Sequence, residues 1–184
     1  MKSSIRGAVL GMAVLFSAQV AHAQAMSFGL GGGIVVPTGS LSDGTSTGYS
    51  GTALLRLQPP ASPVGFQVDA SYTRFGLDGI DGHSRMLVGT ANAVYAFPGA
   101  SAAKPYLIGG LGLYNGKTSL DGGPSSDSQT KFGLNAGAGF DFGFGKAKLY
   151  AEGRFHAIMK GVGDGTTGEE KTAYMIPLTV GVRF

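Results

Sequence analysis

The sequence predicts an all-β fold, an eight-stranded antiparallel up-and-down transmembrane β-barrel with a polar, side-chain-filled interior. Three observations lead to this prediction. Eight segments alternate apolar and polar residues, long and short connections alternate between them, and the composition combines 14% charged residues with 33 glycines. Successive side chains of a strand point to opposite faces, so each alternating segment has one apolar face. The charged fraction lies well below the roughly 25% of an ordinary soluble domain.

The chain begins with a segment typical of a secretory signal peptide. An apolar run at 7–20 follows two cations, and Ala21-His22-Ala23 has the small-residue pattern of a cleavage site. The run is too short to cross a membrane as a helix, which takes about 20 apolar residues. We therefore predict a cleaved signal peptide at 1–23 and an exported barrel domain at 24–184. Cleavage after Ala25 is the alternative.

Charge and cysteine content exclude several classes of site. Removal of the signal peptide takes away two cations and lowers the formal net charge from +3 to +1, so the sequence pI of about 9.2 does not indicate a nucleic-acid partner. There is no cysteine, which excludes disulfides and thiolate metal sites. We expect no cofactor, no metal and no nucleic acid.

The first four alternating segments lie at 27–36, 49–58, 64–73 and 85–97. Each places its larger apolar side chains on one parity. In chain order these are Phe28, Leu30, Ile34 and Val36; Tyr49, Ala53, Leu55 and Leu57; Val64, Phe66, Val68, Ala70 and Tyr72; and Leu87, Ala91, Ala93, Tyr95 and Phe97. A polar loop follows the first and third segments, and a short turn follows the second and fourth.

The fifth segment, at 106–114, is rich in glycine and its phase is ambiguous. We assign Tyr106, Ile108 and Tyr114 to the outside, although three leucines share the other parity, which leaves the phase open. The longest polar loop follows at 115–129.

The last three segments, at 131–142, 148–157 and 174–184, alternate most regularly. Their apolar parity holds Phe132, Leu134, Ala136, Ala138, Phe140 and Phe142; Leu149, Ala151, Gly153, Phe155 and Ala157; and Tyr174, Ile176, Leu178, Val180, Val182 and Phe184. A turn at 143–146 and a polar loop at 161–172 connect them. The segments have about 9 to 13 residues, and a tilted transmembrane strand needs about 9–11. The first and last strands are expected to pair, because lipid offers no hydrogen bonds to an open edge.

Aromatic residues gather near both ends of the expected strands, as in the girdles of membrane barrels. Near the turns these are Phe28, Phe66, Tyr95, Phe97, Tyr106, Phe140, Phe142 and Phe184. Near the loops these are Tyr49, Tyr72, Phe75, Tyr114, Phe132, Phe155 and Tyr174. A soluble lipocalin-type barrel is the main alternative, since periodicity alone does not tell which face meets the solvent. The belts, the loop asymmetry and the terminal aromatic residue favour the membrane barrel.

The opposite parity carries charges and amides, which we expect to form a polar network inside the barrel. Its predicted members are Arg56, Asp69, Lys131, Asn135, Asp141, Lys148, Glu152 and Arg154. Opposite charges in a narrow, poorly hydrated lumen should pair. The expected register places Arg56 opposite Gln67, Asp141 opposite Lys148, Gly137 opposite Glu152, and Asn135 opposite Arg154. We interpret the network as a structural plug, with a narrow or gated polar path as the alternative.

The segment at 174–184, with its apolar parity and terminal phenylalanine, resembles the last strand of bacterial outer-membrane barrels. The whole chain after the signal peptide is similar to the small outer-membrane β-barrel family, OmpA/OmpX-like and opacity-protein-like, and the Glu-x-Arg of Glu152 and Arg154 also resembles that family. The resemblance implies the outer membrane of a Gram-negative-type bacterium. It also implies an assembly signal, assigned to Tyr174, Val180, Val182 and Phe184.

The same resemblance implies the partners and the function classes. Expected partners are outer-membrane lipid and lipopolysaccharide, the barrel assembly machinery, periplasmic chaperones and an unknown extracellular ligand, with the barrel itself a monomer. The first function is a structural or surface-interaction role, adhesin-like or opacity-like, through four extracellular loops. A narrow pore for small solutes and an outer-leaflet lipid-modifying enzyme are the alternatives. We expect no enzyme, because His83 and His156 have no identifiable nucleophile in reach.

Overall fold

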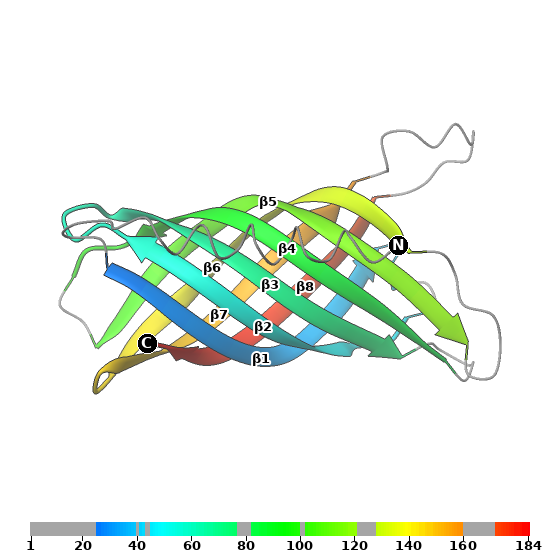
Figure 1. The fold of residues 1–184 in the computed structure, drawn as a ribbon, viewed down its shortest axis with the longest axis horizontal. Helices are drawn as coiled ribbons and strands as arrows, with labels where there is room; N and C mark the ends of the chain where they lie inside the picture. The colour runs from blue at the N-terminus through cyan, green and yellow to red at the C-terminus, as the bar shows by residue number, and fades with distance from the viewer. Residues whose placement is uncertain are drawn as a thin grey trace, which may run out of the picture.

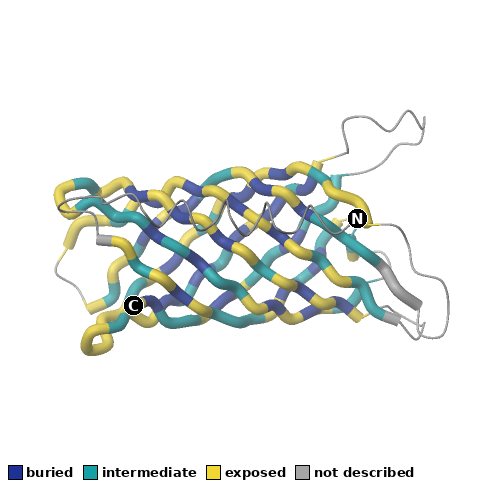
Figure 2. Tube along the Cα trace, viewed as in Figure 1, coloured by how far each residue is buried: buried dark blue, intermediate teal, exposed yellow. Residues whose placement is uncertain are grey.

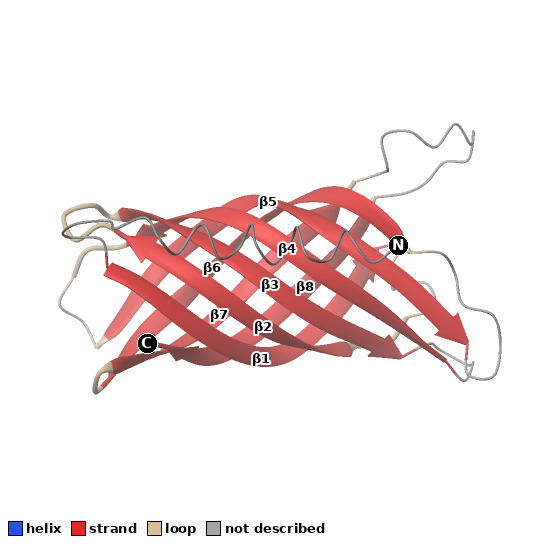
Figure 3. Ribbon diagram, in the orientation of Figure 1, coloured by secondary structure: helices blue, strands red, loops and turns tan. Residues whose placement is uncertain are grey.

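The computed structural model describes residues 25–39, 41–42, 45–76, 82–99, 102–120, 128–159 and 172–184. Eight antiparallel strands follow one another around a closed barrel (Figures 1 and 3). They are β1 (Ala25–Gly39), β2 (Gly48–Gln58), β3 (Val64–Gly76), β4 (Gly82–Ala96), β5 (Ala103–Leu120), β6 (Gln129–Phe144), β7 (Ala147–Ile158) and β8 (Ala173–Arg183). No helix in these ranges has the length and apolar character needed to cross a membrane. The predicted signal peptide lies outside the described residues and stays a prediction.

The barrel closes where β1 pairs with β8, from Gly29 opposite Arg183 to Gly39 opposite Ala173. Each strand therefore has two neighbours and no edge is left unpaired, as a lipid environment requires. The predicted eight-stranded antiparallel barrel is confirmed. β1, β3, β5 and β7 end at one end of the barrel, here named the loop end, and β2, β4, β6 and β8 end at the other, the turn end (Figure 1).

The strands extend beyond their predicted bounds at the loop end. β5 continues to Leu120, although the residues after 114 were predicted to form a loop, and it pairs with β4 as far as Gly82. Polar residues such as Asn115 and Lys117 lie in this extension. Paired strands that extend beyond the lipid-facing part of the barrel need no apolar face. Alternation of hydrophobicity therefore cannot predict where their pairing ends.

Burial alternates along the strands, with exposed and buried residues interleaved around the barrel (Figure 2). The outward face is apolar, and Phe66, Val68, Leu87, Leu134 and Val180 are all more than 40% exposed. This agrees with the parity predicted for every strand except the fifth.

The predicted phase of the fifth strand is wrong. Tyr106, Ile108 and Tyr114 are buried inside the barrel, and the leucines of the other parity are exposed. Glycines on β6 make room for both tyrosines: a Cβ on Gly139 would lie 2.4 Å from the Tyr106 ring, and one on Gly133 would lie 2.7 Å from Tyr114. The hydroxyls of Tyr106 and Tyr114 have partners inside the barrel, whereas leucine loses nothing by facing lipid.

The predicted aromatic belts are also wrong in part, because some of their residues point into the barrel. Phe75, Tyr106 and Tyr114, which the sequence placed in the belts, lie inside. Tyr49, Tyr72, Phe132 and Phe155 remain exposed toward the loop end, with Tyr174 partly buried beside Phe155. The predicted belt residues that are exposed toward the turn end are Phe28, Phe66, Tyr95, Phe97, Phe140, Phe142 and Phe184.

The expected register of the β6–β7 hairpin is also wrong, by two residues. Asp141 lies opposite Tyr150, Gly137 opposite Arg154, and Asn135 opposite His156. The connection is a two-residue turn rather than the predicted four, and Gly145 enters it with φ of 61°, a conformation that glycine adopts without strain. In the β2–β3 hairpin, Arg56 lies opposite Gln67 as predicted.

Candidate functional site

The lumen of the barrel is filled in layers. Near the turn end, Val94, Tyr106 and Ile108 form a small apolar cluster. Polar and charged side chains cross the middle, and a larger apolar cluster closes the loop end. The larger cluster, here named the apolar layer, consists of Val35, Phe75, Val88, Tyr114, Ile158 and Met175.

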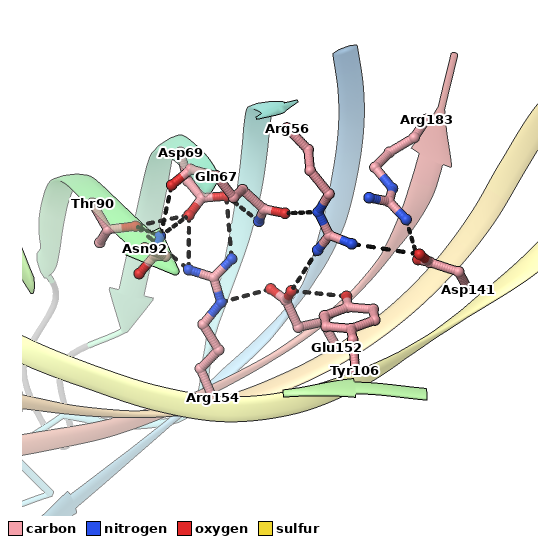
Figure 4. Close-up of polar contacts among 10 residues, drawn as sticks. All are labelled: Arg56, Gln67, Asp69, Thr90, Asn92, Tyr106, Asp141, Glu152, Arg154 and Arg183. Atoms are coloured by element: carbon pink, nitrogen blue, oxygen red, sulfur yellow. Dashed lines mark hydrogen bonds and ion pairs between the residues drawn. The ribbon is translucent and has the colours of Figure 1, made fainter. Parts of the chain in front are cut away.

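Five of the predicted network residues meet in the middle layer: Arg56, Asp69, Asp141, Glu152 and Arg154 (Figure 4). The other three do not join this arrangement. Asn135 is buried, but its side-chain amide has no hydrogen-bond partner in the described part of the chain. Lys131 is partly buried near the loop end, and Lys148 is exposed at the turn end, where it lies opposite Gly143 rather than Asp141.

Asp69 of β3 is the most heavily hydrogen-bonded group of the network. Its two carboxylate oxygens accept from Arg154 on β7 at 2.8 and 3.1 Å, an arrangement that spans the lumen because β3 and β7 are not neighbours. They also accept from Gln67, Thr90 and Asn92 at 2.7 Å each. A bidentate arginine and several neutral donors fix both the position and the charge of this carboxylate.

Glu152 links the Asp69 group to a second arginine. One of its oxygens accepts from Arg154 Nε at 2.6 Å, and the other accepts from the Tyr106 hydroxyl at 2.8 Å. Arg56 Nη2 lies 4.0 Å from the same carboxylate, and its Nε donates to Gln67 at 2.6 Å. The Arg56 guanidinium also lies 4.3 Å from the centre of the Tyr106 ring, a cation–π distance.

Asp141 ends the chain of contacts near the turn end. It lies 3.4 Å from Arg56 Nη1 and forms an ion pair with Arg183 of β8. Gly29 of β1 leaves the space for Arg183, since a Cβ there would lie 2.6 Å from the arginine Cγ.

The network balances three arginines against three carboxylates, so it is formally neutral. All six charged groups are buried except Asp141, whose side chain is 14% exposed. Removing charges from water is costly, and around Asp69 the bidentate arginine and the neutral donors counter that cost. Arg183 and Tyr106 were absent from the predicted network. Arg183 could have been included, because its inward parity is evident from the sequence. Tyr106 was missed because the fifth strand was assigned the wrong phase.

A small cavity of about 30 Å³ separates the network from the apolar layer. Asp69 and Arg154 line the side of the cavity that faces the network, and Val35, Val88 and Met175 line the side that faces the apolar layer. A buried water molecule needs roughly 10–15 Å³ of such space, so only about two could fit.

On the outer side of the apolar layer lies an open bowl of about 470 Å³. The apolar side chains of Leu41, Met86, Ile158 and Ala173 contribute to its lining, and Lys131 is among its polar residues. The Tyr114 hydroxyl, below, lies 2.8 Å from His156 Nδ1. The described ranges contain no group of three His, Asp or Glu side chains that could hold a metal ion.

The sequence from residue 8 to residue 184 matches the family model described as outer membrane protein beta-barrel domain. The chain belongs to this family. It is therefore an outer-membrane β-barrel, and in such barrels the long loops face the cell exterior and the short turns face the periplasm. Comparison with curated proteins found no match.

Solved structures of outer-membrane barrels share the fold. Neisserial surface protein A is 26% identical with a TM-score of 0.68, covering 88% of this chain and 97% of that one. A major outer membrane protein of Thermus thermophilus is 13% identical with a TM-score of 0.60, covering 87% and 99%. The N-terminal barrel of Pseudomonas aeruginosa OprF is 19% identical with a TM-score of 0.51, covering 89% and 100%.

Proposed function

We propose that this barrel is a closed scaffold that acts at the cell surface through its outer end, in a structural or adhesin-like role. The observation that carries the proposal is the filling of the lumen at two levels. The arginine–carboxylate network joins opposite walls, and the apolar layer lies above it. A path for solutes along the lumen would have to open both of these layers.

The outer end has the features of an interaction surface. The bowl combines an apolar floor with polar walls, and the β4–β5 hairpin carries strand structure out to Gly82 and Leu120. Four connections follow at this end, at 40–47, 77–81, 121–128 and 159–172. The name of Neisserial surface protein A, the structure at 26% identity, also supports a surface role.

Conductance separates the scaffold from the alternative of a narrow pore. The refolded protein in a planar bilayer should show no steady conductance in molar salt. Steady channel openings in the wild-type protein would contradict a closed scaffold and would support the pore.

Adhesion tests the surface role itself. Cells that display the barrel should bind to an epithelial cell monolayer more than cells without it. A variant with short Gly-Ser linkers in place of 121–127 and 160–171 should lose this gain. Heat-modifiable migration on a gel, which reports a folded barrel, would show that the variant still folds. Equal adhesion of both folded proteins, or no gain from the wild type, would contradict the role.

A further inference from the structure

Three cations form a row on the outside of the barrel near its loop end. Arg74 on β3 lies opposite Arg85 on β4, and Arg85 lies opposite Lys117 on β5. All three have the outward parity of their strands. Both arginines are exposed, and Lys117 is partly buried and also lines the open bowl. Directly opposite residues of an antiparallel pair have Cβ atoms about 4.5–5.5 Å apart, so the row extends over roughly 10 Å.

The row is set apart by its charge. Among the charged residues of the eight described strands, only Arg74, Arg85 and Lys117 have outward parity. Like charges directly opposite each other destabilise a sheet. The acidic residues of the described ranges are Asp69, Asp141 and Glu152, all of which point into the lumen, so none of them offsets this repulsion.

The position of the row matches the headgroup level of the outer leaflet. One outward position closer to the middle of the barrel, Tyr72 lies opposite Leu87, and both are exposed to lipid, 48% and 58%. Leu113 on β5 continues this apolar surface at 59% exposure. Arg74 and Arg85 therefore lie directly above side chains that contact acyl chains, and on β5 Asn115 lies between Lys117 and Leu113.

We propose that this row binds the phosphate groups of an anionic glycolipid of the outer leaflet. Arginine pairs with phosphate through two parallel hydrogen bonds, and a doubly charged phosphate would relieve the repulsion within the row. The acyl chains of the same lipid would lie against Tyr72, Leu87 and Leu113. A soluble anion would use the cations but not this apolar surface, so a lipid headgroup is the ligand that accounts for both.

The test uses lipid A as the probe, added to the refolded protein in a neutral detergent. Native mass spectrometry measures the fraction of protein that retains the lipid, for the wild type and for R74Q/R85Q/K117Q. One Lys or Arg near an anionic lipid surface contributes roughly fivefold in affinity, so the triple variant should bind about a hundredfold more weakly. Lipid A stripped of its phosphates should bind the wild type as weakly, and inorganic phosphate at the same concentration should not displace bound lipid A.

A matched control removes three lysines at the turn end, which are exposed but do not form an outward row: K104Q/K146Q/K148Q. This variant should bind lipid A like the wild type. R74K/R85K keeps the charge but not the paired hydrogen bonds of arginine, so its affinity should fall between those of the wild type and R74Q/R85Q/K117Q. Heat-modifiable migration verifies the folding of each variant. The proposal is overturned if both triple variants lose the same affinity, if stripped lipid A binds equally well, or if inorganic phosphate displaces the lipid.

Discussion

The inside and the outside of this barrel differ in where they carry charged residues. In the lumen, three carboxylates are paired with three arginines through direct contacts, some along one strand and some across the barrel. On the outside, the strands carry no charge along the lipid-facing band of the described residues, and cations appear only in the row of Arg74, Arg85 and Lys117. Burial alone therefore does not exclude charge from this protein. Charged side chains lie where an opposite charge, or in our proposal a lipid headgroup, can contact them.

The largest effect should come from unpairing the interior, in Arg154→Met. This change leaves Asp69 and Glu152 buried without the cation that bridges them. Loss of one partner of a buried ion pair costs about 3–5 kcal/mol, and we expect this loss in the free energy of unfolding. Urea titration of the refolded barrel, followed by its heat-modifiable gel shift, measures it.

The double variant R154M/D69N distinguishes charge from packing. It leaves Glu152 and Asp141 against Arg56 and Arg183, so the interior is again formally neutral. We expect it to be more stable than R154M alone. If the double variant is the less stable of the two, the pairing of charges is not what stabilises this layer.

A smaller loss should follow from adding a charge to the outside, in Val180→Arg. Val180 is 65% exposed on the lipid-facing side of β8. An arginine at the bilayer midplane of such a barrel costs about 2–4 kcal/mol, with less toward the interfaces. Urea titration in lipid vesicles measures the cost. Val180→Leu is the control and should unfold like the wild type, whereas an unchanged midpoint for the arginine variant would place Val180 away from the lipid.

Most of the outside of the barrel could be predicted from the sequence, because the lipid face depends only on local alternation. Val68 and Val180 were assigned outward from their neighbours alone, and both are exposed. The rule failed in β5, where both parities hold large side chains and glycines fill the gaps. The Tyr106 hydroxyl is satisfied by Glu152, which is 46 residues away, and no local pattern contains that partner.

The pairing inside the barrel was less predictable, because it depends on register and on contacts across the lumen. Asp69 and Arg154 are 85 residues apart on non-adjacent strands, so alternation places both inside but does not bring them together. A turn two residues shorter than expected moved every partner in the β6–β7 hairpin. The outward cation row likewise becomes visible only when the register of three strands is known.

The smallest change in stability should come from Lys148→Gln, a substitution that tests where the interior network ends. The sequence placed Lys148 in the network opposite Asp141, but the lysine is exposed beyond it, and Asp141 is paired with Arg56 and Arg183 instead. Exposed substitutions away from special features stay within about 0.5 kcal/mol, so the urea midpoint should not move. Asp141→Asn, measured beside it, should lower the midpoint because it leaves two arginines facing each other. Equal losses in the two variants would mean that Lys148 does contribute to the interior network.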